Sequence, residues 1–124
     1  MKKVLVVEDN RYNMRLITYV LQRNGYEVIP AETGEEAIEL AIRERPFFII
    51  VDINLPGIDG LEATRRIRSA ETDGSIPIIA ITSYAMSGDS DQILQAGCTA
   101  YFEKPFDPLN IIDKIHAVIG VKND

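Results

Sequence analysis

The amino-acid sequence predicts a parallel α/β fold. Short runs rich in β-branched residues alternate five times with segments whose apolar residues recur at helical spacing. The third and fourth runs, at 47–51 and 76–81, are apolar almost throughout, as strands are when helices cover both faces of a sheet. This alternation is typical of a sheet whose parallel strands are joined by helical crossovers.

The first strand is predicted at 4–7, where four apolar residues precede two acidic ones. The segment after it places Leu16, Ile17, Val20 and Leu21 at the spacing of an amphipathic helix. Gly25 then stands where a glycine commonly ends a helix. The first strand and helix therefore form one complete unit.

The second strand is predicted at 26–29. Thr33 and Glu36 have the spacing of a capping box, which predicts the start of the next helix. That helix ends before Pro46, because the residue preceding a proline disfavours the helical conformation. The buried strand at 47–51 follows directly.

The later elements carry similar signals. A helix is expected before the fourth strand at 76–81, and Gly97 marks the end of the helix before the fifth strand at 99–102. Asp107 is followed by proline, which predicts that the last helix begins there, and Gly120 marks its end.

The composition limits the classes of function. The chain has 124 residues, with 13 Lys and Arg against 19 Asp and Glu, so its net charge is −6. We expect one domain over 1–124, with the polar stretch at 72–75 as a loop. The acidic balance disfavours nucleic acid and anionic membranes, since both are bound through Lys and Arg. Cys98 is the only cysteine and no apolar run approaches the ~20 residues of a membrane span, so a cytoplasmic protein is expected.

Three carboxylates follow predicted strand ends. Glu8 and Asp9 come after the first strand, and Asp52 after the third. If these strands are neighbours, the three side chains converge, and ionised carboxylates that converge imply a cation between them. Oxygen ligands favour Mg²⁺, Mn²⁺ or Ca²⁺, and Mg²⁺ fits a site with few protein ligands because it usually keeps several waters.

A hydroxyl and an ammonium follow the last two strands. Thr82 comes after the fourth strand, and Lys104 after the fifth. Facing a cluster of carboxylates and metal, they would form a cradle for a tetrahedral dianion. The combination points to transfer of a phosphoryl group to a carboxylate.

These residues belong to longer motifs spread over four strand ends. The motifs are Val6-Val7-Glu8-Asp9-Asn10 with Asn13, the run from Val51 to Gly60, Ile81-Thr82, and the run from Gly97 to Tyr101 leading into Lys104-Pro105-Phe106. Across essentially its whole length the sequence resembles the receiver domain of two-component response regulators. The resemblance implies a flavodoxin-like doubly wound fold, with a five-stranded parallel sheet in the order 2-1-3-4-5 and helices on both faces.

The resemblance also implies roles for the site residues. Asp52 would be the phosphoacceptor, and Mg²⁺ would be bound by Asp9, Asp52 and the backbone carbonyl of Asn54, with Glu8 acting through a water. Lys104 would pair with Asp52 and then with the phosphoryl oxygens. The histidine kinase or histidine phosphotransfer protein that donates the phosphoryl group would be a partner, and the domain would assist its own modification without being an enzyme.

The same resemblance implies a switch. Thr82 would move towards the phosphoryl group, and Tyr101 would turn inward into the vacated space. The peptide bond between Lys104 and Pro105 would be cis, which an X–Pro bond permits at low cost. We expect a downstream protein target to bind through the fourth helix, fifth strand and fifth helix. Asn54 and Tyr84 would tune the lifetime of the phosphoryl group.

Three other functions fit these residues less well. A phosphohydrolase of the haloacid dehalogenase type needs a second acid two residues after its nucleophile, where this chain has Asn54. A nucleotide-binding domain should have a glycine-rich loop after the first strand, where Glu8 and Asp9 stand. An interaction module independent of phosphorylation has no need of Asp9, Asp52, Thr82 and Lys104 together.

Only 121–124 follow Gly120, so no output domain is expected and output would go through protein contacts. The sequence leaves three settings open. The receiver could act as a free regulator, as an intermediate in a phosphorelay, or as part of a hybrid kinase.

Overall fold

The computed structural model describes residues 2–71, 76–83 and 89–120. The predicted loop at 72–75 and Tyr84 lie outside these residues. The elements follow one another as β1 (Lys2–Val7), α1 (Arg11–Arg23), β2 (Tyr26–Ala31), α2 (Gly34–Glu44), β3 (Phe48–Asp52), α3 (Gly60–Ala70), β4 (Ile78–Thr82), α4 (Asp89–Gln95), β5 (Ala100–Glu103) and α5 (Ile111–Ile119).

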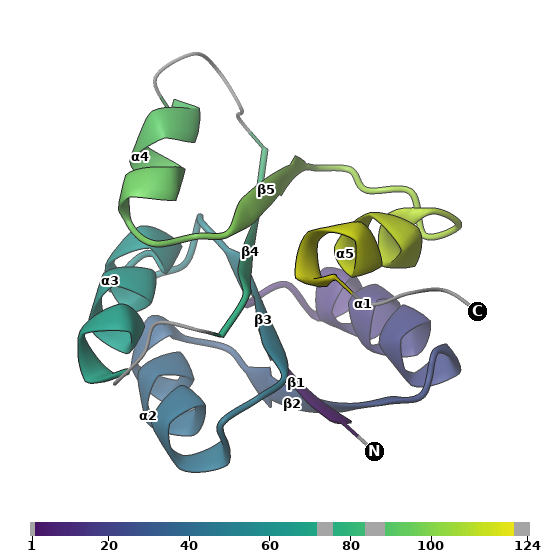
Figure 1. Ribbon diagram of the computed structural model, residues 1–124, viewed down its shortest axis with the longest axis horizontal. Helices are drawn as coiled ribbons and strands as arrows, with labels where there is room; N and C mark the ends of the chain where they lie inside the picture. Colours follow the sequence, from purple (N-terminus) through teal and green to yellow (C-terminus); the bar gives the residue numbers. More distant parts are fainter. Residues whose placement is uncertain (1, 72–75, 84–88, 121–124) are drawn as a thin grey trace.

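The strands form one parallel sheet in the order β2-β1-β3-β4-β5. α1 and α5 cover one face, and α2, α3 and α4 cover the other (Figure 1). The predicted fold class and strand order are therefore confirmed. Within the described part of the chain, no helix has the length and apolar character needed to cross a bilayer.

The core has two layers because successive strand residues point to opposite faces of the sheet. In β1, Val4 and Val6 pack with the residues beneath α1 and α5. Leu5 and Val7 pack with the residues beneath α2, α3 and α4. All five residues of β3 and all five of β4 are buried, as predicted for strands covered on both faces. The sheet is therefore a rigid support for the side chains that follow its strands.

All five strands differ from their predicted bounds by one or two residues at one end or both, and the last helix also begins later than predicted. β4 begins at Ile78 rather than at residue 76, because Pro77 has no N–H to donate to a ladder, although its carbonyl accepts the Ile49 N–H at 2.9 Å. α5 begins at Ile111 rather than directly after Asp107. Asp107 does act as a cap, since its Oδ1 accepts the Leu109 N–H at 2.9 Å, but it caps an irregular turn that leads into the helix.

Candidate functional site

The carboxyl ends of three neighbouring strands bring the site together. Val7 of β1 pairs with Val51 of β3, so Glu8 and Asp52 follow at the same level of the sheet. Asp52 itself pairs with Ile81 of β4, and Thr82 is the next residue. The predicted convergence of strand ends is therefore present.

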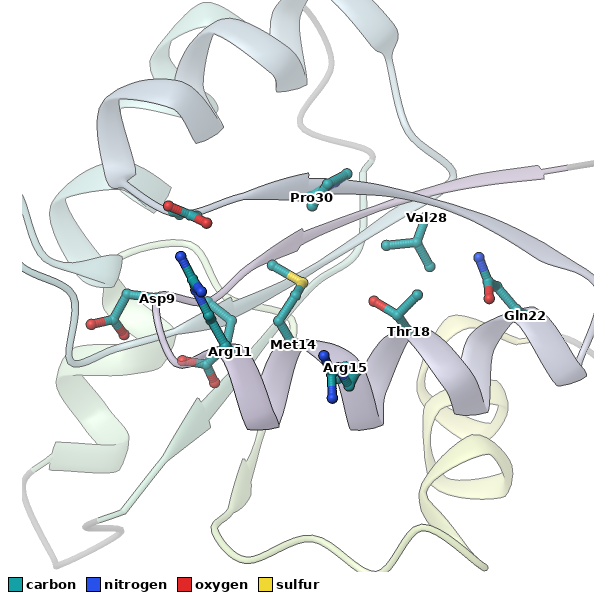
Figure 2. Close-up of a pocket in the computed structure, with 10 residues that line it drawn as sticks. Asp9, Arg11, Met14, Arg15, Thr18, Gln22, Val28 and Pro30 are labelled. Carbon is teal, nitrogen blue, oxygen red and sulfur yellow. The ribbon is translucent and has the colours of Figure 1, made fainter.

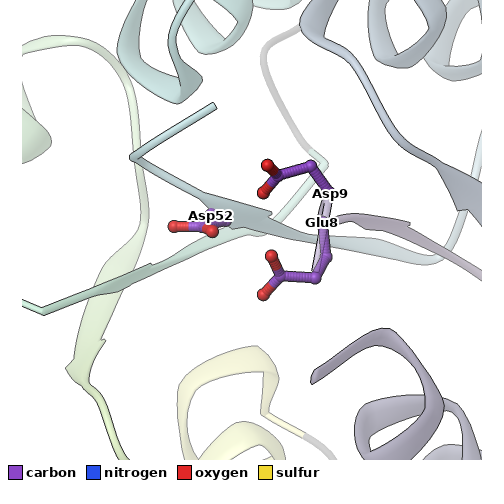
Figure 3. Close-up of side chains that lie close together, drawn as sticks. All are labelled: Glu8, Asp9 and Asp52. Carbon is purple, nitrogen blue, oxygen red and sulfur yellow. The ribbon is translucent and has the colours of Figure 1, made fainter. Parts of the chain in front are cut away.

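The three acidic side chains share one small space (Figure 3). Glu8, Asp9 and Asp52 each offer a carboxylate oxygen, and these oxygens lie within 4.8 Å of one another. Glu8 is 2% exposed and Asp52 4% exposed, whereas Asp9 is open to solvent. Two buried carboxylates this close need a positive charge beside them to remain ionised together.

Lys104 supplies a positive charge from the loop after β5. Its Nζ lies 2.9 Å from Asp52 Oδ2 and 3.5 Å from Glu8 Oε1. Burial alone lowers the pKa of Lys104, but the hydrogen bond and charge of Asp52, together with Glu8, outweigh burial and raise it overall. Lys104 is therefore a fixed cation at neutral pH. The peptide bond between Lys104 and Pro105 is cis, as the resemblance implies.

Backbone amides hold the remaining oxygens of the two buried acids. The Asn10 N–H donates to Glu8 Oε2 at 3.1 Å, and the Asn54 N–H donates to Asp52 Oδ1 at 3.0 Å. With the Lys104 ammonium beside the other two oxygens, every carboxylate oxygen of Glu8 and Asp52 has a partner. Both side chains are thus fixed in orientation before any ligand enters.

Glu8 has a strongly shifted protonation equilibrium. The pKa of Glu8 is raised from 4.5 to about 7, chiefly by burial and next by the neighbouring Asp52 carboxylate, which together outweigh the lowering by the Asn10 amide and by Lys104. Near neutral pH the cluster therefore holds a proton that a bound cation would release.

We expect the free energy of unfolding, measured without divalent metal, to fall as the pH rises from about 4.5 to about 7. The folded state favours protonated Glu8, so this stabilisation is complete below pH 4.5 and is lost as the pH passes about 7. The full effect is on the order of 3 kcal/mol. Urea unfolding of wild type and Glu8→Gln in EDTA measures it, and a difference between the two that does not change with pH would contradict the assignment.

Gly60 fits the site's backbone for a steric reason that sequence reasoning missed. A Cβ built on Gly60 would overlap the carbonyl oxygen of Asp52 and lie 2.8 Å from the Ile53 Cα. α3 therefore begins directly against the end of β3, and the Gly60 N–H donates to the Ile53 carbonyl at 2.9 Å. Gly60 belongs to the motif quoted above, but the motif gives no sign of this contact.

The other predicted residues lie around the acidic cluster. Thr82 is 3% exposed at the end of β4, and its carbonyl accepts the Lys104 N–H at 2.8 Å. Tyr101 is half-buried in β5 and packs against the core layer beneath α2, α3 and α4. Asn54 is exposed, and its N–H rather than its carbonyl contacts Asp52. The acidic cluster and Lys104 are thus in direct contact, while Thr82 and Tyr101 are near by on neighbouring strands.

Comparison with known proteins gives the family. The family model described as "Response regulator receiver domain" matches residues 4–116. The chain belongs to the response regulator receiver domain family. The polar-differentiation response regulator DivK of Brucella anthropi is 41% identical over 119 residues, which cover 96% of this chain and 97% of that protein. This receiver domain is thus similar over nearly its full length to a response regulator of about the same size.

Solved structures of other receiver domains share the fold. The receiver domain of the sensor histidine kinase PA1611 from Pseudomonas aeruginosa PAO1 is 39% identical, with a TM-score of 0.87 over 96% of this chain and 98% of that one. That structure has a magnesium ion coordinated in its active-site cleft. The chemotaxis protein CheY4 of Vibrio cholerae is 30% identical, with a TM-score of 0.89 over 95% of this chain and 98% of that one. This receiver domain is therefore a two-component signalling domain with a CheY-like fold.

Proposed function

We propose that this receiver domain accepts a phosphoryl group on Asp52 from a histidine kinase or a histidine phosphotransfer protein, in a reaction that depends on Mg²⁺. The observation that carries the proposal is the arrangement of Asp52, a buried carboxylate held by Lys104 at 2.9 Å beside Glu8 and Asp9. A nucleophile, a fixed cation and a set of oxygen ligands are what phosphoryl transfer to a carboxylate requires.

The donor set fits magnesium. Glu8, Asp9 and Asp52 offer only oxygen ligands, and Asp9 is open to solvent, which suits an ion that keeps several waters. Asp9 and Asp52 would hold the ion, with Glu8 and the carbonyl of Asn54 completing the protein's share. When bound, Mg²⁺ neutralises charge on the phosphoryl oxygens. The ion bound in the PA1611 receiver supports this reading.

The chain's own residues account for the transfer. An oxygen of Asp52 attacks the phosphorus, so a P–O bond forms while the P–N bond to the donor's histidine breaks, and the electron pair returns to the imidazole nitrogen. The Lys104 ammonium moves from the carboxylate to a phosphoryl oxygen, where it stabilises the transferring group. The hydroxyl of Thr82 donates a hydrogen bond to the same group. The domain is thereby modified itself, whereas an enzyme would be regenerated after each turnover.

Phosphorylation would then change the domain's protein contacts. The phosphoryl group adds roughly −1.5 to −2 charges and three acceptor oxygens next to Thr82 and Lys104. Movement of Thr82 towards it opens space into which Tyr101, half-buried on the neighbouring strand, turns. Because β5 carries Tyr101 and lies between α4 and α5 in Figure 1, we place the target-binding face on these three elements.

Intact mass after incubation with acetyl phosphate tests the proposal. We expect wild type with Mg²⁺ to gain the mass of one phosphoryl group, and to lose it in alkali as an acyl phosphate does. Asp52→Asn and a chelated sample should gain nothing. Asp59→Asn is the matched control, because Asp59 is an exposed acid whose capping bond to the Glu62 N–H an asparagine can keep. Phosphorylation of Asp52→Asn at the wild-type level would overturn the assignment.

A further inference from the structure

The loop that joins β3 to α3 carries one of the proposed metal ligands, the carbonyl of Asn54. Both ends of the loop are fixed by hydrogen bonds. The Asn54 N–H donates to Asp52 Oδ1 at 3.0 Å, and the Asp59 side chain caps α3. Within the described part of the chain, no backbone hydrogen bond involves residues 56–58. The position of the middle of this loop therefore depends on packing.

The first turn of α2 provides that packing. Gly34 is buried, and a Cβ built on it would lie 2.9 Å from the Ile58 carbonyl oxygen and 3.2 Å from Ile58 Cγ1. The next residue of the helix also meets the loop, since a Cβ built on Gly57 would lie 3.5 Å from Glu35 Oε2. Only a residue without a side chain lets the helix approach the Ile58 backbone this closely. Two consecutive residues of α2 thus face two consecutive residues of the loop.

The loop and α2 also share one part of the core. Leu55 is 8% exposed and belongs to the core layer that contains Ala37 and Ala41 of α2. α2 cannot withdraw from the loop without uncovering this side chain. Because protein interiors are closely packed, a displacement at the first turn of α2 must therefore move the loop.

The opposite side of the acidic cluster is open. Asp9 lies at one end of a groove of about 480 Å³ between α1 and β2, into which Met14 points from α1 (Figure 2). The Asp9 side chain is exposed, so it can adjust its position to a bound ion. The distances between the metal ligands are therefore set from the side of the loop.

We propose that Gly34 is a positioning residue for Mg²⁺. By letting the first turn of α2 rest on Ile58, it holds the Asn54 carbonyl in place relative to Asp9 and Asp52. This inference rests on the proposed function and deepens it. Mg²⁺ demands near-ideal octahedral geometry, so a displaced ligand lowers its affinity. A methyl group at position 34 would meet backbone atoms, which cannot swing aside as a flexible side chain can.

An NMR titration of the whole isotope-labelled chain with Mg²⁺ alone tests the proposal. The Asn54 amide signal gives the Kd. We expect Gly34→Ala to raise the Kd at least about fivefold, because residues that orient metal ligands commonly change affinity by about 10–100-fold. Ile58→Ala loosens the same contact without any overlap and should raise the Kd as well. If Gly34→Ala does not fold, Ile58→Ala decides the question.

Phosphorylation by acetyl phosphate gives an independent measurement. Both variants should need more Mg²⁺ than wild type for a half-maximal rate, and both should approach the wild-type rate once Mg²⁺ is saturating. A general loss of stability would not produce this separation of affinity from maximal rate.

The matched control is Ile42→Gly, which also leaves the net charge unchanged. Ile42 is 53% exposed near the other end of α2, where a glycine weakens the helix but touches no part of the loop. Its Kd for Mg²⁺ should equal that of wild type. A wild-type Kd in folded Gly34→Ala and in Ile58→Ala, or an equal rise in Ile42→Gly, would overturn the proposal and leave the phosphoacceptor role intact. Failure of wild type to bind Mg²⁺ would overturn the proposed function as well.

Discussion

Replacing Lys104 with methionine is expected to lower the free energy of unfolding by about 2–4 kcal/mol at pH 8 without divalent metal. The change keeps an unbranched side chain only one heavy atom shorter, but it leaves the buried Glu8 and Asp52 carboxylates beside each other with no ammonium between them. Phosphorylation by acetyl phosphate should also slow by about 100-fold, because a donor to the transferring group is lost. Urea unfolding and the intact-mass assay measure the two effects.

The effect of Mg²⁺ on stability provides a second measurement in the same experiment. The ion and the Lys104 ammonium compensate the same negative charges, so Mg²⁺ should stabilise Lys104→Met more than it stabilises wild type. Lys3→Met is the matched control, because Lys3 forms a Lys–Glu pair of 3.1 Å with Glu44 at the surface. Such a pair is worth less than about 1 kcal/mol. Equal losses of stability in the two variants would show that the ion pairs of Lys104 with Asp52 and Glu8 stabilise the fold no more than a surface ion pair does.

Replacing Gly60 with alanine is expected to lower the free energy of unfolding by about 2–3 kcal/mol, although alanine is the better helix former by about 1 kcal/mol. The added methyl group would overlap the Asp52 carbonyl oxygen and crowd the Ile53 Cα, so the end of β3 must shift. Because Asp52 is carried on that backbone, phosphorylation should slow as well. Thermal unfolding and the intact-mass assay follow the two consequences in one set of samples.

Gly25→Ala separates crowding from backbone strain. Gly25 has φ of 85° but open space around it, so its alanine variant should lose only about 1 kcal/mol and phosphorylate normally. A Gly60→Ala variant as stable and as readily phosphorylated as wild type would mean that α3 can withdraw from β3 without cost.

Local patterns were enough to predict most of the fold. The fully buried β3 and β4 follow from apolar runs, and the predicted helix ends at Gly97 and Gly120 coincide with positive φ values of 114° and 82°. The strand order could not be predicted from local patterns, because periodicity indicates that the strands are parallel but not which of them are neighbours. That order came from the family resemblance alone.

The site was predictable to the extent that strand ends determine it. Glu8 and Asp52 had to converge once β1 and β3 were neighbours, and the structure has them buried side by side. Spacing along the sequence does not show how far a long side chain reaches. The contact of Lys104 with Glu8 as well as with Asp52 was therefore not predicted. The steric role of Gly60 was missed for a similar reason, since it depends on the distance between two backbones.

The four occupied oxygens of Glu8 and Asp52 have a consequence for how the cleft responds to its surroundings. A cation that arrives there finds both carboxylates already held in place by donors of the chain itself, and it competes with the Lys104 ammonium for their negative charge. Exchange between partners of similar strength leaves a small net free energy. The fraction of clefts that hold a ligand therefore rises and falls with the concentration of that ligand in solution, so binding at this site is readily reversed.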